Sequence, residues 1–252
     1  LYLKHLSLTN FRNFTRLDMD VPRRSVLLVG DNAQGKTGIL EAIYFLAALT
    51  SFQTNADRQM VNFLEARNTP AVGRIVGEYA RGTRSHKLEV RLILEPTGVN
   101  GQRLRKEILL DGVKKQASEA VGKFSAVVFA PQMSQIIEGG PDERRRYLNL
   151  ALAQAVPAYA GALNDYAKAL EQRNALLKSL NERAGNADQL EVWDETLARL
   201  GAQIILWRIA AVQELEKQAA RIHLELTRGD EVLRLAYEPS FDPLPKIALK
   251  LD

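Results

Sequence analysis

The chain has 252 residues, of which 46% are hydrophobic and 25% charged, and this ordinary globular composition excludes a disordered or fibrous protein. Its net charge is +4, which is compatible with a polyanionic partner. The sequence contains no cysteine, which excludes disulfides, iron–sulfur clusters and thiol nucleophiles, and its three scattered histidines have no metal-ligand spacing. No apolar run reaches the roughly 18 residues that span a bilayer, and the N-terminus lacks the apolar core of a secretory leader. We therefore expect a cytoplasmic protein without membrane contact.

The first half of the chain predicts an antiparallel sheet. Residues 1–7 and 17–21 alternate between apolar and polar side chains on either side of a turn, which is typical of two paired strands. Residues 72–80, 87–94 and 104–110 alternate in the same way and are separated by turns that contain glycine. These three segments predict a meander of antiparallel strands.

Other segments of the first half predict buried elements. The apolar runs at residues 25–29 and 124–129 are typical of strands that are buried on both faces. Residues 36–49 place apolar side chains at helical spacing, so they predict a helix with one buried face. A short helix is expected at residues 57–64.

The phosphate-binding motif G-x-x-x-x-G-K-[ST] lies between the expected strand and the expected helix. The matching residues are Gly30, Asp31, Asn32, Ala33, Gln34, Gly35, Lys36 and Thr37. Glycines allow the backbone to aim its N–H groups at phosphate oxygens, and the helix N-terminus adds a positive dipole end. We expect Lys36 to bridge the β- and γ-phosphates of a nucleotide and Thr37 to bind Mg²⁺. The alternative, a simple strand-to-helix turn, does not explain the Lys-Thr pair.

No catalytic acid is expected in this chain. Hydrolysis requires a carboxylate at the end of a second buried strand. Glu95 precedes a proline within the predicted meander, and Asp111 precedes a glycine, as in a hairpin turn. We interpret both as turn residues.

The second half predicts two helices between residues 143 and 228, separated by a polar turn at 181–187. Apolar residues recur at heptad spacing on both sides of this turn. They are Leu163, Tyr166, Leu170, Leu177 and Leu180 before it, and Leu190, Trp193, Leu197, Leu200 and Ile204 after it. The pattern predicts an antiparallel helical hairpin, or alternatively an amphipathic helix pair within a bundle. Residues 231–237 alternate again and predict a return to the sheet.

Several sequence blocks, taken in order, resemble the RecF family of ABC-type ATPases, which is related to the SMC and Rad50 proteins. The blocks are KHLSLTNFRNF, GDNAQGKTGILEAIYFLA, VVFAP, GGPDERRRYLN, YAKALEQRNALLK and VWDETLARLGAQI. They extend over nearly the whole chain. The resemblance implies an ATP-dependent clamp for recombinational repair and replication that forms a homodimer as the complete protein. It would bind double-stranded DNA at gaps or single-strand junctions and help RecO and RecR to load RecA.

The resemblance also implies ATP and Mg²⁺ as cofactors and assigns residues to them. The nucleotide contacts are Gly30, Asp31, Asn32, Ala33, Gln34, Gly35, Lys36, Thr37, Gly38 and Arg12. Arg12 matches the arginine that reaches the nucleotide from the N-terminal strands in this superfamily, and a surface arginine in a turn is the alternative. Gln132 falls in a segment like the Q-loop, which contacts the metal.

The resemblance implies an α/β fold: an ABC-type P-loop ATPase head with an antiparallel β subdomain, plus a helical hairpin arm. The head lobe would occupy residues 1–142, the arm residues 143–228, and a truncated return to the head sheet residues 229–252. The chain begins without methionine and ends within a strand-like segment. We therefore expect a fragment without the ABC signature and Walker B strand, which binds ATP without hydrolysing it. The alternatives are an SMC/Rad50-like ATPase with another role, a P-loop small-molecule kinase and a silent interaction module.

Clusters of basic residues suggest a DNA-binding surface, because Lys and Arg contact phosphates without reading the base sequence. The expected contacts are Arg81, Arg84, Arg105, Lys106, Lys114 and Lys115. Solvated strand faces are the alternative. A further basic triplet at residues 144–146 follows two acids at an expected helix start, and the competing interpretations are that it pairs with these acids or bridges the two lobes.

Overall fold

The computed structural model describes residues 1–54, 56–67, 70–97, 101–182 and 187–239, with the side chain of Gln132 outside this description. The chain forms two compact units, Leu1–Pro157 and Ala158–Asp252. The first unit includes helix α4 (Pro141–Ala155), so the units divide later in the chain than the boundary expected near residue 142. No helix in these ranges is both long and apolar enough to cross a lipid bilayer.

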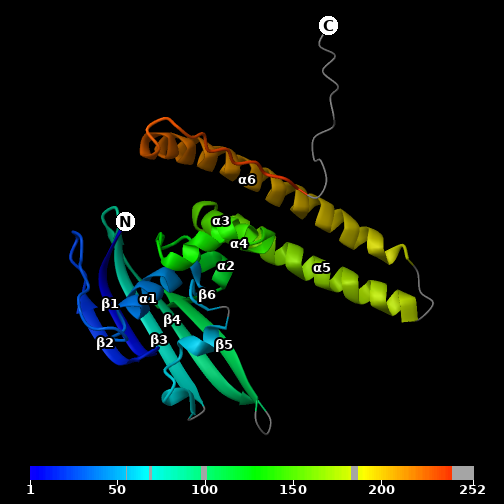
Figure 1. Cartoon of the computed structure of the whole chain (residues 1–252). Helices are drawn as coiled ribbons and strands as arrows, with labels where there is room; N and C mark the ends of the chain where they lie inside the picture. Colours follow the sequence, from blue (N-terminus) through cyan, green and yellow to red (C-terminus); the bar gives the residue numbers. More distant parts are fainter. Residues whose placement is uncertain (55, 68–69, 98–100, 183–186, 240–252) are drawn as a thin grey trace. The chain divides into compact units, whose positions relative to one another are not determined.

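An antiparallel sheet of six strands forms the centre of the first unit (Figure 1). The strands are β1 (Tyr2–Phe11), β2 (Phe14–Asp20), β3 (Ala71–Arg81), β4 (Arg84–Thr97), β5 (Gly101–Leu110) and β6 (Val113–Lys115). They are arranged in the order β2-β1-β3-β4-β5-β6. The paired N-terminal strands and the meander expected from the alternating pattern are confirmed, because a period of two places the apolar residues on one face.

Helix α1 (Lys36–Ala48) covers one face of this sheet, as expected from its apolar spacing (Figure 1). Phe45 and Leu46 of the helix are buried in the core. A Cβ atom on Gly77 of β3 would lie only 2.6 Å from Leu46 Cδ1, so the glycine permits the close approach of helix and sheet. The opposite face of the sheet, here called the outer sheet face, carries alternating charged residues.

Short helices connect these elements. They are η1 (Asp57–Met60), η2 (Glu65–Arg67), α2 (Ala117–Ala120), η3 (Pro131–Ser134) and α3 (Gln135–Glu138). The helix expected at residues 57–64 is thus one 3₁₀ turn that ends at Met60.

The prediction of two buried strands at residues 25–29 and 124–129 is wrong. Both segments have no strand pairing in the described chain apart from an isolated bridge between Val121 and Phe124. Several of their apolar side chains are exposed, with Leu27 at 86% and Val127 at 101% of full exposure, whereas Phe124 is buried. A strand forms only where a neighbouring backbone accepts and donates its hydrogen bonds, and the described chain offers none here.

The second unit contains the expected helical hairpin, formed by α5 (Tyr159–Glu182) and α6 (Gln189–Leu226) (Figure 1). An ion pair between Arg173 of α5 and Asp194 of α6 joins the two helices. The expected seam on α6 includes Ile204, which is buried. On α5 the expected positions are partly wrong, because Ala169 is buried whereas Leu170 and Leu177 are each 38% exposed.

The chain after α6 does not form the expected strand at residues 231–237. It runs back along the helix instead. Glu231 Oε2 lies 3.1 Å from His223 Nε2, and Arg234 Nη1 lies 3.3 Å from Glu216 Oε1. Residues 240–252, which include most of the expected return to the sheet, lie outside the described residues.

Candidate nucleotide-binding site

The phosphate loop leads directly into α1. Gly30, Ala33 and Gly35 adopt positive φ angles of 154°, 63° and 92°. These angles curl the loop around the side chain of Lys36, whose Nζ donates to the carbonyl oxygens of Gly30 and Asp31, both at 2.6 Å. The loop therefore surrounds the ammonium group that is expected to meet the phosphates.

Gly35 is required by its surroundings as well as by its backbone angle. A Cβ atom at this position would lie 2.5 Å from Phe14 Cζ and 2.8 Å from Asn13 Oδ1. The turn between β1 and β2 thus packs against the phosphate loop, and Asn13 Nδ2 also donates to the Ala33 carbonyl at 3.0 Å. The sheet and the loop hold each other in position.

A cavity of about 690 Å³ opens beside the loop. Its lining includes the motif residues from Asn32 to Thr37 and Gly38, together with Arg12, Asn13, Glu41, Gln53, Gln59, Val61, Asn62, Phe63 and Leu64. Its volume lies within the range of about 300–1,000 Å³ that is usual for ligand sites. The curled loop, the lysine and the helix N-terminus fit the phosphate groups of a nucleotide. Thr37, at the start of α1, offers a hydroxyl for a magnesium ion.

Arg12 lies in the wall of this cavity, but its guanidinium is held by a carboxylate. Its Nε donates to Glu41 Oε2 at 2.7 Å and its Nη2 to Glu41 Oε1 at 2.6 Å. Glu41 is fully buried and also accepts a hydrogen bond from Ser51 Oγ. Glu41 was not singled out from the sequence. A charged residue among the apolar positions of the expected helix was the signal that could have indicated a buried, paired carboxylate.

The acidic residues considered as catalytic candidates lie elsewhere. Asp111, with a φ of 51°, forms the β5–β6 turn and accepts hydrogen bonds from His86 Nδ1 at 2.8 Å and from the Lys87 amide at 2.7 Å. The contact with His86 is the main cause that lowers the pKa of Asp111. Glu95 pairs with Arg105 at 2.9 Å. The interpretation of Asp111 as a turn residue is confirmed, whereas that of Glu95 is wrong, because Glu95 lies within strand β4 and pairs with Arg103 of β5 in the sheet. Gln132 belongs to η3 and its side chain lies outside the description.

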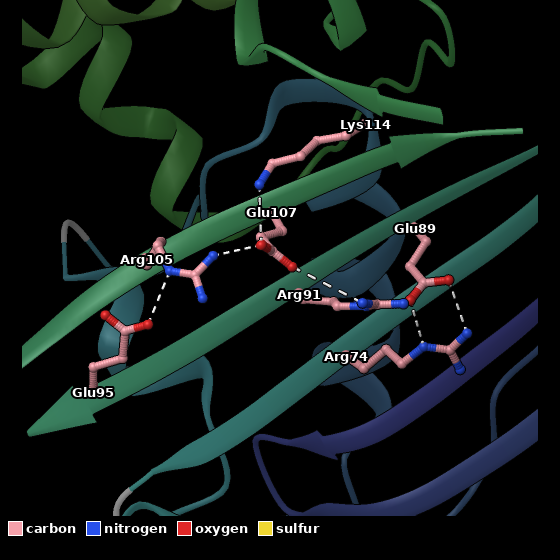
Figure 2. Close-up of polar contacts among 7 residues, drawn as sticks. All are labelled: Arg74, Glu89, Arg91, Glu95, Arg105, Glu107 and Lys114. Atoms are coloured by element: carbon pink, nitrogen blue, oxygen red, sulfur yellow. Dashed lines mark hydrogen bonds and ion pairs between the residues drawn. The ribbon is translucent and has the colours of Figure 1, made fainter. Parts of the chain in front are cut away.

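Several of the expected DNA contacts form ion pairs on the outer sheet face (Figure 2). Arg105 Nη1 lies 2.5 Å from Glu107 Oε1, and Lys114 Nζ lies 3.1 Å from the same oxygen. Lys106 projects to the other face, where it pairs with Asp57 and donates to the Leu49 carbonyl at 3.0 Å.

The same face continues toward β3. Glu89 lies between two arginines, because Arg74 Nε and Arg91 Nε lie 2.8 Å and 2.6 Å from its Oε1 (Figure 2). The hydrogen bonds from these guanidinium groups, that from Arg74 above all, lower the pKa of Glu89 to about 2. Cations and carboxylates therefore alternate across β3, β4 and β5, and the face is close to neutral.

The remaining expected contacts differ from these. Lys115 Nζ lies 3.9 Å from Glu119 on α2. Arg81 and Arg84 face each other at the ends of β3 and β4 and form no ion pair with any described residue. Of the triplet at 144–146, Arg144 donates to the carbonyl groups of Ile136 and Ile137 on α3, and Arg145 pairs with Asp142, as one interpretation of the sequence expected.

Comparison with known proteins finds ATPase relatives of this chain. The AAA ATPase domain family matches residues 1–195. The DNA replication and repair protein RecF of Exiguobacterium sp. (strain ATCC BAA-1283 / AT1b) is 37% identical over 94% of this chain and 60% of the relative. RecF of Roseiflexus castenholzii is 37% identical over 95% of this chain and 63% of the relative. The chain thus spans less than two thirds of the length of these relatives.

Two solved structures share the fold. One is described as the recombination mediator protein RecF-ATP in the RecFOR pathway. It is 31% identical with a TM-score of 0.78, over 90% of this chain and 58% of that chain. The other, RecF-ATPrS, is 32% identical with a TM-score of 0.76 over the same shares. The α/β fold of the antiparallel sheet and its helices is that of the RecF ATPases. The chain therefore belongs to the AAA ATPase domain family, and RecF proteins match it over nearly all of its length.

Proposed function

We propose that this chain is the nucleotide-binding part of an ATP-dependent DNA-binding protein of recombinational repair. The observation that carries this proposal is the phosphate loop wrapped around Lys36 beside a cavity large enough for a nucleotide. ATP would occupy the cavity with its phosphates at the loop and with Mg²⁺ at the Thr37 hydroxyl. When bound, Mg²⁺ would neutralise phosphate charge.

We infer the role of the complete protein from the RecF relatives. The full-length protein would form an ATP-dependent homodimer in the cytoplasm, at the nucleoid. It would hold double-stranded DNA at gaps or single-strand junctions and act with RecO and RecR in loading RecA. ATP binding would favour the closed, DNA-holding state, and hydrolysis would release it.

Cations at one end of the sheet are the best supported DNA contacts. This group, here called the sheet-end cations, consists of Lys4, Arg23, Arg81 and Arg84. Lys4 Nζ donates to Ser85 Oγ at 3.3 Å, and Arg23 lies 4.3 Å from the centre of the Tyr2 ring. None of the four pairs with a carboxylate within the described ranges, in contrast to Arg105 and Lys114.

Unpaired cations gain more from phosphate than paired ones, because no carboxylate has to be displaced. Arg81 and Arg84 are therefore preferred over Arg105, Lys106, Lys114 and Lys115 as DNA contacts. Their contribution would be independent of base sequence and sensitive to salt.

DNA binding tests this proposal. The full-length protein should bind a gapped duplex more tightly with Mg²⁺ and ATP than without, and Lys36→Ala should remove that difference. The double variant Arg81→Ala/Arg84→Ala should weaken binding, and the slope of log K against log salt concentration should become shallower by about one to two. The matched control is Arg105→Ala/Lys114→Ala on the outer sheet face. DNA affinity that is equal in both double variants would contradict the choice of the sheet-end cations. Affinity without any response to ATP would contradict the switch.

A further inference from the structure

The cavity beside the phosphate loop is also lined by an exposed aromatic side chain. Phe63 is 68% exposed and lines the same cavity as the phosphate loop, with Leu64 beside it at 65%. A large apolar side chain in water is unfavourable unless it serves an interaction, and here it stands at the rim of a ligand-sized cavity. Phosphate binding by the loop does not require the Phe63 ring.

Phe63 is held in place by its backbone neighbours. Asn62 N donates to the Asn10 carbonyl at 2.8 Å, and its Nδ2 donates to the Arg12 carbonyl at 2.8 Å. The Asn62 side-chain oxygen accepts from the Leu64 amide at 3.0 Å, and the Arg12 amide donates to the Met60 carbonyl at 2.7 Å. The segment that carries Phe63 is thus fastened to the end of β1, which also supplies Arg12 to the cavity.

The Phe63 ring is further oriented by Arg67, whose guanidinium carbon lies 4.3 Å from the ring centre. A guanidinium over the face of a ring is attracted to it electrostatically, which helps to hold the ring in place. A ring that is already fixed loses little freedom when a ligand packs against it. The cavity lining also includes Val61, Gln53 and Gln59, which offer an apolar side chain and two amide groups.

We propose that Phe63 is the platform for the base of the bound nucleotide, and that it determines the preference of the site for nucleotides over simple polyphosphates. The inference rests on the proposed nucleotide binding and names the second half of that site. Its chemistry is stacking of a flat heteroaromatic ring on Phe63, with the triphosphate directed toward Lys36. Stacking of this kind tolerates any base, so discrimination between bases would depend on the amides of Gln53 and Gln59.

Calorimetric titration of the 252-residue chain with Mg-ATP and with magnesium tripolyphosphate, which has no base, tests the proposal. Phe63→Ala should weaken ATP binding about tenfold and leave tripolyphosphate binding unchanged. Phe63→Tyr, which keeps the ring, should restore ATP affinity. The control is Phe129→Ala, which removes a more exposed ring (93%) that does not line the cavity.

The outcomes separate the two proposals. Unchanged ATP affinity in Phe63→Ala, with Lys36-dependent binding of both ligands intact, would overturn the base platform alone. An equal loss for ATP and tripolyphosphate would also overturn it, because the change would then act through the fold of the loop. If the unsubstituted chain bound neither ligand, the proposed nucleotide binding itself would fail.

Discussion

The guanidinium of Arg12 and the carboxylate of Glu41 form a two-point ion pair, with both N–O distances below 2.8 Å. Arg12 belongs to the turn between β1 and β2, whereas Glu41 lies one turn into the helix that begins at the phosphate loop. Glu41 is fully buried and Ser51 donates to it from the other end of the helix. One carboxylate thus joins the strand turn, the helix and the loop that follows it.

Removal of Arg12 should destabilise the protein strongly. Arg12→Ala leaves a buried carboxylate without its cation, so we expect the free energy of unfolding to fall by about 3–5 kcal/mol. Urea unfolding measures this change. The control is Arg105→Ala, whose ion pairs lie exposed on the outer sheet face and should contribute little to stability. Similar losses in the two variants would show that the burial of Glu41 does not determine the effect.

The stability of the first unit should fall in acid through Glu89. Its pKa of about 2 lies below the ordinary value of 4.5, because Arg74 and Arg91 stabilise the carboxylate. The unfolded chain therefore takes up the proton first as the pH falls. The stabilisation is complete above about pH 4.5 and decreases toward pH 2, by up to about 3 kcal/mol.

The test compares unfolding free energies at pH 6 and pH 3 for the unsubstituted chain and for Glu89→Gln. The variant should lose less stability over this interval, because it has no proton to take up at this position. Other carboxylates whose pKa is lowered, such as Asp18 and Glu107, remain in both proteins and cancel in the comparison. An identical pH dependence would contradict the assignment to Glu89.

Gly35→Ala should abolish nucleotide binding. The added Cβ would meet the Phe14 ring at 2.5 Å, and the φ of 92° is strained for any side chain. We expect a lower melting temperature and loss of ATP binding. Gly140→Ala is a suitable control, because its Cβ meets nothing within 4 Å and its φ is −79°. Normal ATP affinity in Gly35→Ala would show that the loop can shift away from Phe14.

The 252-residue chain should bind ATP without turning it over. Glu41 is the only acidic residue that lines the cavity in the described part of the chain, and it is held by Arg12 and Ser51. No carboxylate in these ranges is therefore available there to activate water. Phosphate release should equal the background rate without protein. Release above background that disappears in Lys36→Ala would refute this expectation.

The sequence predicted those elements whose cause is local. Alternation defined β1 to β5, the spacing of apolar residues defined α1, and the polar turn separated α5 from α6. The phosphate loop was equally visible, because its glycines and Lys36 occur at fixed spacing. The strands expected at residues 25–29 and 124–129 failed for a different reason: strand formation depends on a neighbouring backbone, which an apolar run does not reveal.

The pairing of charged residues also depends on tertiary structure that the sequence does not reveal. The sequence shows that Arg91, Arg105 and Lys114 are basic, but only the register of the sheet places Glu107 beside all three. The Arg12–Glu41 pair joins residues far apart in the chain, so no local sequence pattern predicts it. On α5 a shift of one position placed Ala169 in the seam in place of Leu170, because small residues fit a close helix contact as well as leucine does.

Calorimetric titration with Mg-ATP tests the central claim, that this chain contains a working nucleotide site, most directly. The account predicts saturable binding at one site, loss of this binding in Lys36→Ala, and retention in Lys123→Ala, which removes an exposed lysine outside the cavity. Circular dichroism of the three proteins establishes that each is folded. Absence of binding by the folded, unsubstituted chain, or equal affinity in Lys36→Ala, would contradict the account.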